Sequence, residues 1–239
     1  MYDHSYNPTT IYKSETTQLK HINVQKLSNT PDRYQAHLIN CLSGFKSANL
    51  IGTINSQGQT NLAMFSSVVH LGSSPPLIGF ITRPHSVTRH TLDNIQQTKQ
   101  YTINQVSEQF YLGAHQTSAR YLREESEFTQ AGLSEHYIDG YSAPFVKESR
   151  LKYVLTLRDI MPITLNNTQL VIGEVTDILC DEQAIKSDGY IDIEALNSVS
   201  ISGLDSYHVS DRLSRLSYAK TGCVPTNMSV DGKADRKMT

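Results

Sequence analysis

Several features that mark large protein classes are missing from the sequence. The 21 basic and 23 acidic residues leave a net charge of −2, which gives no sign of the positive surface typical of nucleic-acid-binding proteins. No apolar run approaches the roughly 18 residues that a membrane-spanning helix needs. The first ten residues, MYDHSYNPTT, lack the basic and then apolar layout of a signal peptide. We therefore expect a cytoplasmic protein that binds neither nucleic acid nor membranes.

Cysteine is scarce, and tryptophan is absent. The three cysteines, Cys41, Cys180 and Cys223, are an odd number at wide spacing and form no CxxC pair, so we expect free thiols rather than a disulfide framework or a zinc site. The nine histidines show no metal-ligand spacing either, and we expect no metal. Because no GxGxxG motif occurs, a Rossmann nicotinamide domain is not supported.

The chain is long enough to bury one large hydrophobic core. Both of its ends are polar and irregular in pattern. We therefore expect an N-terminal arm over residues 1–29, one folded domain over 30–220 and a polar C-terminal tail over 221–239. At the start of the domain, Thr30 can cap a helix that has Pro31 at its first position.

Strands outnumber helices in the expected domain. Two apolar runs flank a turn that contains Gly58, which predicts a β-hairpin, and Ser86 can cap a helix that continues to Thr98. Gly173 lies inside the last apolar run and indicates a bulge or a close approach of another group. The expected strands cover 45–54, 60–69, 77–82, 100–106, 151–157 and 169–179. Because hairpins dominate over crossovers, we expect a mainly β fold with flanking helices, closed into an antiparallel barrel.

The stretch NLAMFSS, residues 61–67, carries polar and small side chains in a strand that should fill a core. In a strand, Asn61, Ala63, Phe65 and Ser67 share one face and the residues between them share the other, so neither face is purely apolar. A flat ring could lie against such a backbone, with N–H groups and hydroxyls donating to its carbonyls and to a phosphate. The alternative is an edge strand whose hydroxyls bond neighbouring backbone groups.

A second group of polar residues follows the next strand. Arg83 ends that strand, and Ser86, Thr88 and Arg89 lie where the following helix should begin. A helix N-terminus presents unpaired N–H groups and a partial positive charge, so hydroxyls and guanidinium groups there predict an anion site, with phosphate as the expected anion. Alternatively, Ser86 only caps the helix and Arg89 is solvated.

Taken in order, these segments resemble the flavin reductase-like proteins of the FMN-binding split-barrel family. The resemblance covers residues 45–180 and rests on LIGTI, NLAMFSS, SSPPLIGFITRP, TLDNI, YTINQV and VIGEVTDI. It implies a split β-barrel that forms a homodimer and binds FMN near the subunit interface. It also implies a flavin lined by Asn61, Leu62, Ala63, Met64, Phe65, Ser66 and Ser67, with phosphate contacts at Arg83, Ser86, Thr88 and Arg89.

The resemblance implies an oxidoreductase, a flavin reductase that takes hydride from NAD(P)H and passes electrons to a second, small-molecule acceptor. The nicotinamide cofactor would dock transiently over the bound flavin. Because the flavin carries the chemistry, we name no acid, base or nucleophile, and the catalytic residues stay unassigned. Two alternatives remain open: a non-catalytic FMN-binding electron carrier or flavin-storage protein, and a phosphate-ligand oxidase of the pyridoxamine type.

Two further polar segments could approach the flavin. HQTSARYLREESEF, residues 115–128, contains His115 and Ser118, but its charges favour a solvated helical face. GLDSYHVSDRLSRLSYAK, residues 203–220, contains Tyr207 and His208, and His208 could adjust the charge on the flavin or guide the hydride donor. An ordinary amphipathic closing segment explains this second stretch equally well.

Overall fold

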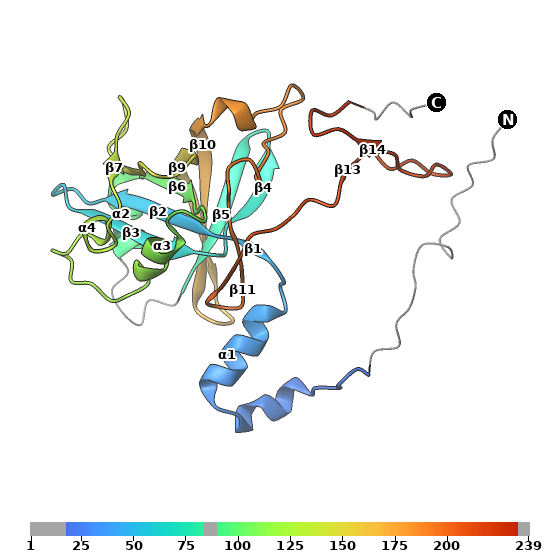
Figure 1. Cartoon of the computed structure of the whole chain (residues 1–239). Coiled ribbons are helices and arrows are strands. Elements are labelled where there is room, and N and C mark those ends of the chain that lie inside the picture. Colours follow the sequence, from blue (N-terminus) through green and yellow to red (C-terminus); the bar gives the residue numbers. More distant parts are fainter. Residues whose placement is uncertain (1–17, 84–89, 234–239) are drawn as a thin grey trace.

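A seven-stranded antiparallel sheet forms the body of the protein (Figure 1). The computed structural model describes residues 18–83 and 90–233. In sheet order the strands are β3 (Thr60–Phe65), β2 (Asn49–Ile54), β6 (Gln100–Gln105), β9 (Leu151–Ile163), β10 (Thr168–Cys180), β5 (Pro76–Thr82) and β4 (Val69–Ser73). The expected hairpin around Gly58 is present, because β2 and β3 pair from Ile54 opposite Thr60 onward. The expected strand over 60–69 is interrupted: β3 ends at Phe65, and β4 begins at Val69.

The sheet curls until its two ends meet, which closes a split barrel. Phe65, at the end of β3, packs against the edge of Phe80 in β5 with ring centroids 5.0 Å apart. The Ser67 hydroxyl donates to the carbonyl of Ile81 at 3.0 Å and accepts from the Ile81 N–H at 3.1 Å. These contacts connect strands that lie far apart in the sheet order. The expectation of a mainly β barrel with few helices is confirmed.

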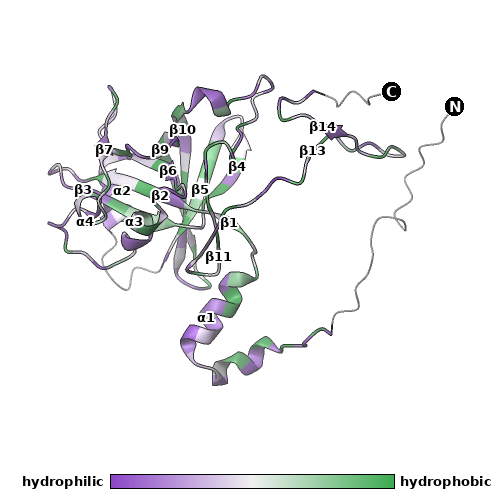
Figure 2. Ribbon diagram, viewed as in Figure 1, coloured by the Kyte–Doolittle hydropathy of each residue, from purple (hydrophilic) through white to green (hydrophobic). Residues whose placement is uncertain are grey.

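Apolar residues pack on both faces of the curved sheet. Figure 2 shows that the strands of the sheet carry many hydrophobic residues. One cluster contains Ile51, Phe80 and Tyr101 and is covered by α2 (His90–Thr98) through Leu92 and Ile95. The other cluster lies under α3 (Tyr111–Gln116) and α4 (Glu127–Gln130) and consists of Ala48, Leu50, Leu62, Val106, Phe110, Ala114, Phe128, Leu133, Val146 and Val199. Consecutive side chains of β2 and β3 alternate between the two clusters, as a strand requires.

Gly173 marks a bulge in the long β9–β10 hairpin, as the sequence predicts. The pairing register shifts between Ile172 and Gly173. A Cβ atom added to Gly173 would lie 2.8 Å from Cζ of Tyr101 and 3.0 Å from Cβ of Leu155. Tyr101 is completely buried, so glycine is needed here to make room for the tyrosine ring.

Three small sheets complete the fold. They are β1 (Lys46–Ser47) with β11 (Ser200–Ser202) and β12 (Ser206–His208), β7 (Glu135–His136) with β8 (Phe145–Val146), and β13 (Arg215–Leu216) with β14 (Asn227–Met228). A short 3-10 helix, η3 (Glu182–Ala184), follows β10. The β13–β14 pairing crosses the expected domain boundary at 220/221. It is attached through Arg215, which pairs with Asp188 at 2.6 Å and stacks 4.1 Å from the centre of the Tyr190 ring.

The N-terminal part of the described chain extends away from the barrel (Figure 1). It contains the 3-10 helix η2 (Val24–Asn29) and α1 (Asp32–Cys41), and no residue of α1 is buried. The expected helix is present, but the expected Thr30 cap is wrong. The Thr30 hydroxyl donates to the Leu27 carbonyl at 2.6 Å and closes η2, while Pro31 is the residue that precedes α1.

Within residues 18–83 and 90–233, none of the helices has the length and apolarity that a bilayer crossing requires.

Candidate functional site

The outer edge of β3 is the best candidate for a ligand-binding surface. β3 is the first strand of the sheet, and β2 is its only strand neighbour there, so one row of its backbone groups faces away from the sheet. That row is covered at two points. The Leu62 N–H donates to the Glu127 carboxylate at 2.9 Å, and Ser67 is bonded to Ile81. The segment between these attachments contains Ala63, Met64, Phe65 and Ser66, all of them half-buried.

Three of the seven side chains expected to line the flavin already have partners inside the protein. Asn61 is buried, and its Nδ2 donates to the Thr91 hydroxyl at 3.0 Å. The Leu62 side chain is completely buried in the cluster under α3 and α4. Ser67 bonds to the backbone of Ile81, which is the role that the edge-strand alternative assigns to such a hydroxyl. A flavin on this edge would therefore meet the backbone more than these three side chains.

Of the four residues expected to hold a phosphate, the structure describes Arg83. Arg83 follows β5 directly and is exposed. Ser86, Thr88 and Arg89 lie outside the described residues. The chain is described again from His90, the first residue of α2, and Thr91 there bonds to Asn61 of β3. The start of α2 and the start of β3 are thus in contact, so a phosphate near α2 could belong to a ligand on β3.

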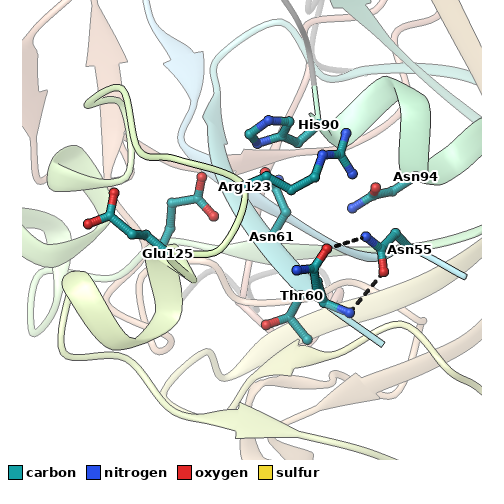
Figure 3. Close-up of a pocket in the computed structure, with 9 residues that line it drawn as sticks. Asn55, Thr60, Asn61, His90, Asn94, Arg123 and Glu125 are labelled. Atoms are coloured by element: carbon teal, nitrogen blue, oxygen red, sulfur yellow. Dashed lines mark hydrogen bonds between the residues drawn. The ribbon is translucent and has the colours of Figure 1, made fainter. Parts of the chain in front are cut away.

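A small polar pocket lies at this junction (Figure 3). Its volume of about 10 Å³ is enough for one water molecule and far too small for a nucleotide. It is lined by Asn55, Gln59, Thr60, Asn61, His90, Asn94, Arg123, Glu125 and Glu127. Asn94 is buried, and its Oδ1 has no hydrogen-bond partner among the described residues, so one water would satisfy it.

Arg123 brings a positive charge to this pocket that the sequence did not indicate. Its Nη2 lies 3.4 Å from an oxygen of Asp93 in α2. Burial, and then the charge of Arg123, lower the pKa of His90. Arg123 belongs to the stretch interpreted as a solvated helical face, and that interpretation is wrong for part of it. α3 ends at Gln116, and Glu127 and Phe128 are buried.

The two secondary candidate segments meet each other. His115 Nδ1 and the Tyr207 hydroxyl lie 3.0 Å apart, and the Tyr207 ring also packs near Tyr111. Burial raises the pKa of Tyr207 to about 12, with a further contribution from Asp205. Tyr111, Tyr207 and Met64 of β3 all pack against the same apolar cluster. Tyr207 is therefore placed on the side of β3 that carries Met64.

The other two candidates of these segments lie apart from that contact. Ser118 is exposed. His208 bonds through Nε2 to the Ser202 hydroxyl at 2.8 Å and packs beside Phe45 at a ring distance of 4.8 Å. Both contacts of His208 lie within or beside the small β1–β11–β12 sheet, so they give it a role in holding that sheet.

The residues around β3 suit a flavin phosphate. The open edge offers backbone donors and acceptors beside the small side chain of Ala63. Arg83 offers a positive charge at the end of β5. Arg123 and His90 offer positive or proton-donating groups at the start of α2, in a pocket that Glu125 and Glu127 also line. A planar ring with carbonyl groups and a charged tail matches this set in chemistry.

Comparisons with known proteins agree with this fold. The model of the flavin reductase like domain matches residues 42–194. A crystal structure from Shewanella frigidimarina, of a split-barrel protein named as a flavin reductase, is 52% identical and has a TM-score of 0.81, covering 84% of this chain and 100% of that one. Nitrilotriacetate monooxygenase component B from Bacillus cereus has a TM-score of 0.74 at 20% identity, with coverage of 84% and 100%, and shows the fold alone.

A relative is also found among curated sequences. Protein BH2278 of Halalkalibacterium halodurans is 30% identical over 156 residues, which cover 63% of this chain and 74% of that protein. The domain match spans the whole seven-stranded sheet and the helices that cover it. The chain therefore belongs to the flavin reductase like domain family, a family of flavin-binding split barrels.

Proposed function

We propose that the protein is an FMN-dependent oxidoreductase that takes hydride from NAD(P)H and delivers the electrons to a second small-molecule acceptor. The observation that carries this proposal is the open edge of β3 between Glu127 and Ile81, in a chain of the flavin reductase family. Bound FMN would supply the hydride-accepting and electron-donating chemistry.

In this proposal the protein binds and orients the cofactor. The backbone of Met64 and Ser66 would hold the ring beside the small side chain of Ala63, because these residues lie along the open part of the edge. Arg83 and Arg123 would neutralise the phosphate, with Ser86, Thr88 and Arg89 as the further contacts that the sequence predicts. Phe65 keeps the open segment in place by packing on Phe80.

A spectroscopic titration tests the proposal. FMN is added to the purified protein, and flavin fluorescence and visible absorbance are followed. The FMN-loaded protein is then mixed anaerobically with NADH and with NADPH, to test whether the bound flavin is reduced. Bleaching of the flavin faster than that of free FMN supports a reductase. A protein that leaves the fluorescence of added FMN unchanged contradicts the proposal.

The second candidate is a non-catalytic electron carrier or flavin store. The same backbone and phosphate contacts would serve this function, and no acid or base is needed in either case. A carrier should bind FMN but show no bleaching beyond the free-FMN background with either nicotinamide.

We also propose a homodimer. No residue of α1 is buried within one chain, while Tyr34, Ile39 and Leu42 are 49%, 41% and 73% exposed. A ten-residue helix has little stability in water without packing, so its apolar side chains need a partner surface. A second copy of the chain would provide it. Light scattering at micromolar concentration should give twice the monomer mass, and a strict monomer would contradict the proposal.

A further inference from the structure

Glu127 is a buried carboxylate that faces the backbone of the proposed flavin strand. The residue is only 6% exposed, and its Oε2 accepts the Leu62 N–H at 2.9 Å. Leu62 and Glu127 are 65 positions apart in the sequence, so this bond joins distant parts of the chain. Phe128, the next residue, packs in the same apolar cluster as Leu62 and fixes α4 beside β3.

The hydrogen bonds of Glu127 come from the backbone. Burial raises the pKa of Glu127, while hydrogen bonds from the Leu62 N–H and from its own N–H lower it. Within residues 18–83 and 90–233, Glu127 forms no ion pair with a lysine, arginine or histidine. A buried carboxylate of this kind is costly unless it accepts hydrogen bonds. The Glu127 carboxylate is therefore stabilised by the Leu62 N–H, and the same hydrogen bond holds the outer edge of β3 at Leu62.

The pairing of β3 determines which of its backbone groups remain open. Leu62 lies opposite Gly52, and Met64 lies opposite Leu50. In an antiparallel pair the N–H groups alternate between pointing to the partner strand and pointing away. Because the Leu62 N–H points away to Glu127, the Met64 N–H points away as well. The carboxylate thus occupies the outward donor at Leu62, and the next one, at Met64, lies in the open segment.

We propose that Glu127 is a positioning residue for the flavin: its carboxylate holds the outer edge of β3 at Leu62, which presents the backbone of Met64 to the ring. Ser67 holds the other end of the same segment through Ile81. Without Glu127, and among the described residues, the outer side of β3 would be held only at Thr60, whose hydroxyl bonds Ser126 and Glu135, and at Ser67. The backbone between them would then lose its alignment with the ligand. The inference rests on the proposed FMN binding at β3.

Two substitutions of Glu127 test separately the length of its side chain and its negative charge. Glu127→Gln keeps an oxygen at the same distance and removes the charge. Glu127→Asp keeps the charge but is one methylene too short to reach the Leu62 N–H. If position matters, Gln should bind FMN within about threefold of the unchanged protein, and Asp should bind about tenfold or more weakly. Binding is measured by fluorescence titration below the melting temperature of every variant.

Glu148→Ala is the matched control. The Glu148 carboxylate also accepts a backbone N–H, that of Ser134 at 3.1 Å, but it follows β8 and its bond is made to the loop before β7. Its loss should leave the dissociation constant for FMN unchanged. Deuterium exchange of a peptide covering residues 60–65 gives a second readout that does not use flavin. Exchange should be faster in Glu127→Asp than in Glu127→Gln.

The outcomes are distinct. Equal FMN affinity in Glu127→Asp and the unchanged protein overturns the inference, as does a tenfold loss in Glu127→Gln. If the unchanged protein binds no FMN, the proposed function fails and this inference fails with it. In that case the exchange data still show whether Glu127 holds the edge of β3.

Discussion

The β9–β10 hairpin and β3 belong to one sheet but are held in different ways. β9 and β10 pair with each other along their length, and their outer sides pair with β6 and β5. β3 has one strand neighbour in the sheet, and a carboxylate and a hydroxyl cover part of its other side. Interior strands are thus fixed by backbone pairing, whereas the edge strand depends on side chains. Edge strands such as β3, unlike β9 and β10, have backbone groups left for a ligand.

The interior hairpin should tolerate little added volume at Gly173. Gly173→Ala would push a methyl group against the buried Tyr101 ring and Leu155, and overpacking of this kind costs about 3 kcal/mol. Urea unfolding measures the change in the free energy of unfolding. Gly72→Ala in β4 is the control, because its nearest neighbour would be the Pro75 carbonyl at 3.5 Å, an ordinary contact. Equal losses in both variants would contradict this account of the bulge.

Ser67→Ala should weaken the closure of the barrel. The change removes two hydrogen bonds and leaves the N–H and carbonyl of Ile81 without these partners, at a cost of about 2 kcal/mol. The same urea experiment measures it. Ser43→Ala removes one exposed bond to Asn40 and should change stability by about 0.5 kcal/mol or less. A loss at Ser67 no larger than that at Ser43 would mean that the hydroxyl does not hold the two ends together.

Arg83→Ala should separate phosphate binding from ring binding. Arg83 is exposed at the end of β5, so its loss should leave the fold intact. A charged contact to phosphate predicts about tenfold weaker binding of FMN. Binding of riboflavin, which lacks the phosphate, should not change. If FMN and riboflavin both bind more weakly by the same factor, Arg83 contacts the ring and not the phosphate. If neither affinity changes, Arg83 is not part of the site.

The smallest expected effect is the pH dependence that Glu127, at the edge of β3, gives to the stability of the protein. Burial raises the pKa of Glu127 above its ordinary value, so the native state holds this proton more tightly than the unfolded chain does. The protein should therefore lose stability from this group as pH rises through the interval between the unfolded and the raised native pKa. Gln does not titrate, so the stability of Glu127→Gln relative to the unchanged protein should increase over that interval. Urea unfolding at several pH values checks this, and a difference that stays constant or falls with pH would show that the group does not titrate as stated.

The sequence predicts the barrel better than it predicts the site, and particular residues show why. Gly58 signals a turn through its own positive φ of 84°, and Gly173 signals a bulge because it interrupts an apolar run, so local sequence indicates both. Glu127 gives no such signal, because its role depends on Leu62, which lies in a strand that the chain reaches 65 positions earlier. A charged run on the sequence looks solvated until the fold shows which of its members is buried. The predicted Thr30 cap is wrong for a similar reason, because the Thr30 hydroxyl donates to the Leu27 carbonyl of the preceding turn.

The attachment of Arg215 affects how the C-terminal hairpin would respond to a protease. Trypsin must draw an arginine side chain into its own specificity pocket, but Arg215 is 17% exposed and is held by Asp188, Val230 and Tyr190. Lys220, at the loop of the same hairpin, is exposed. Within this hairpin, trypsin should therefore cut after Lys220 before it cuts after Arg215, with the preceding strand still bound to the body of the protein.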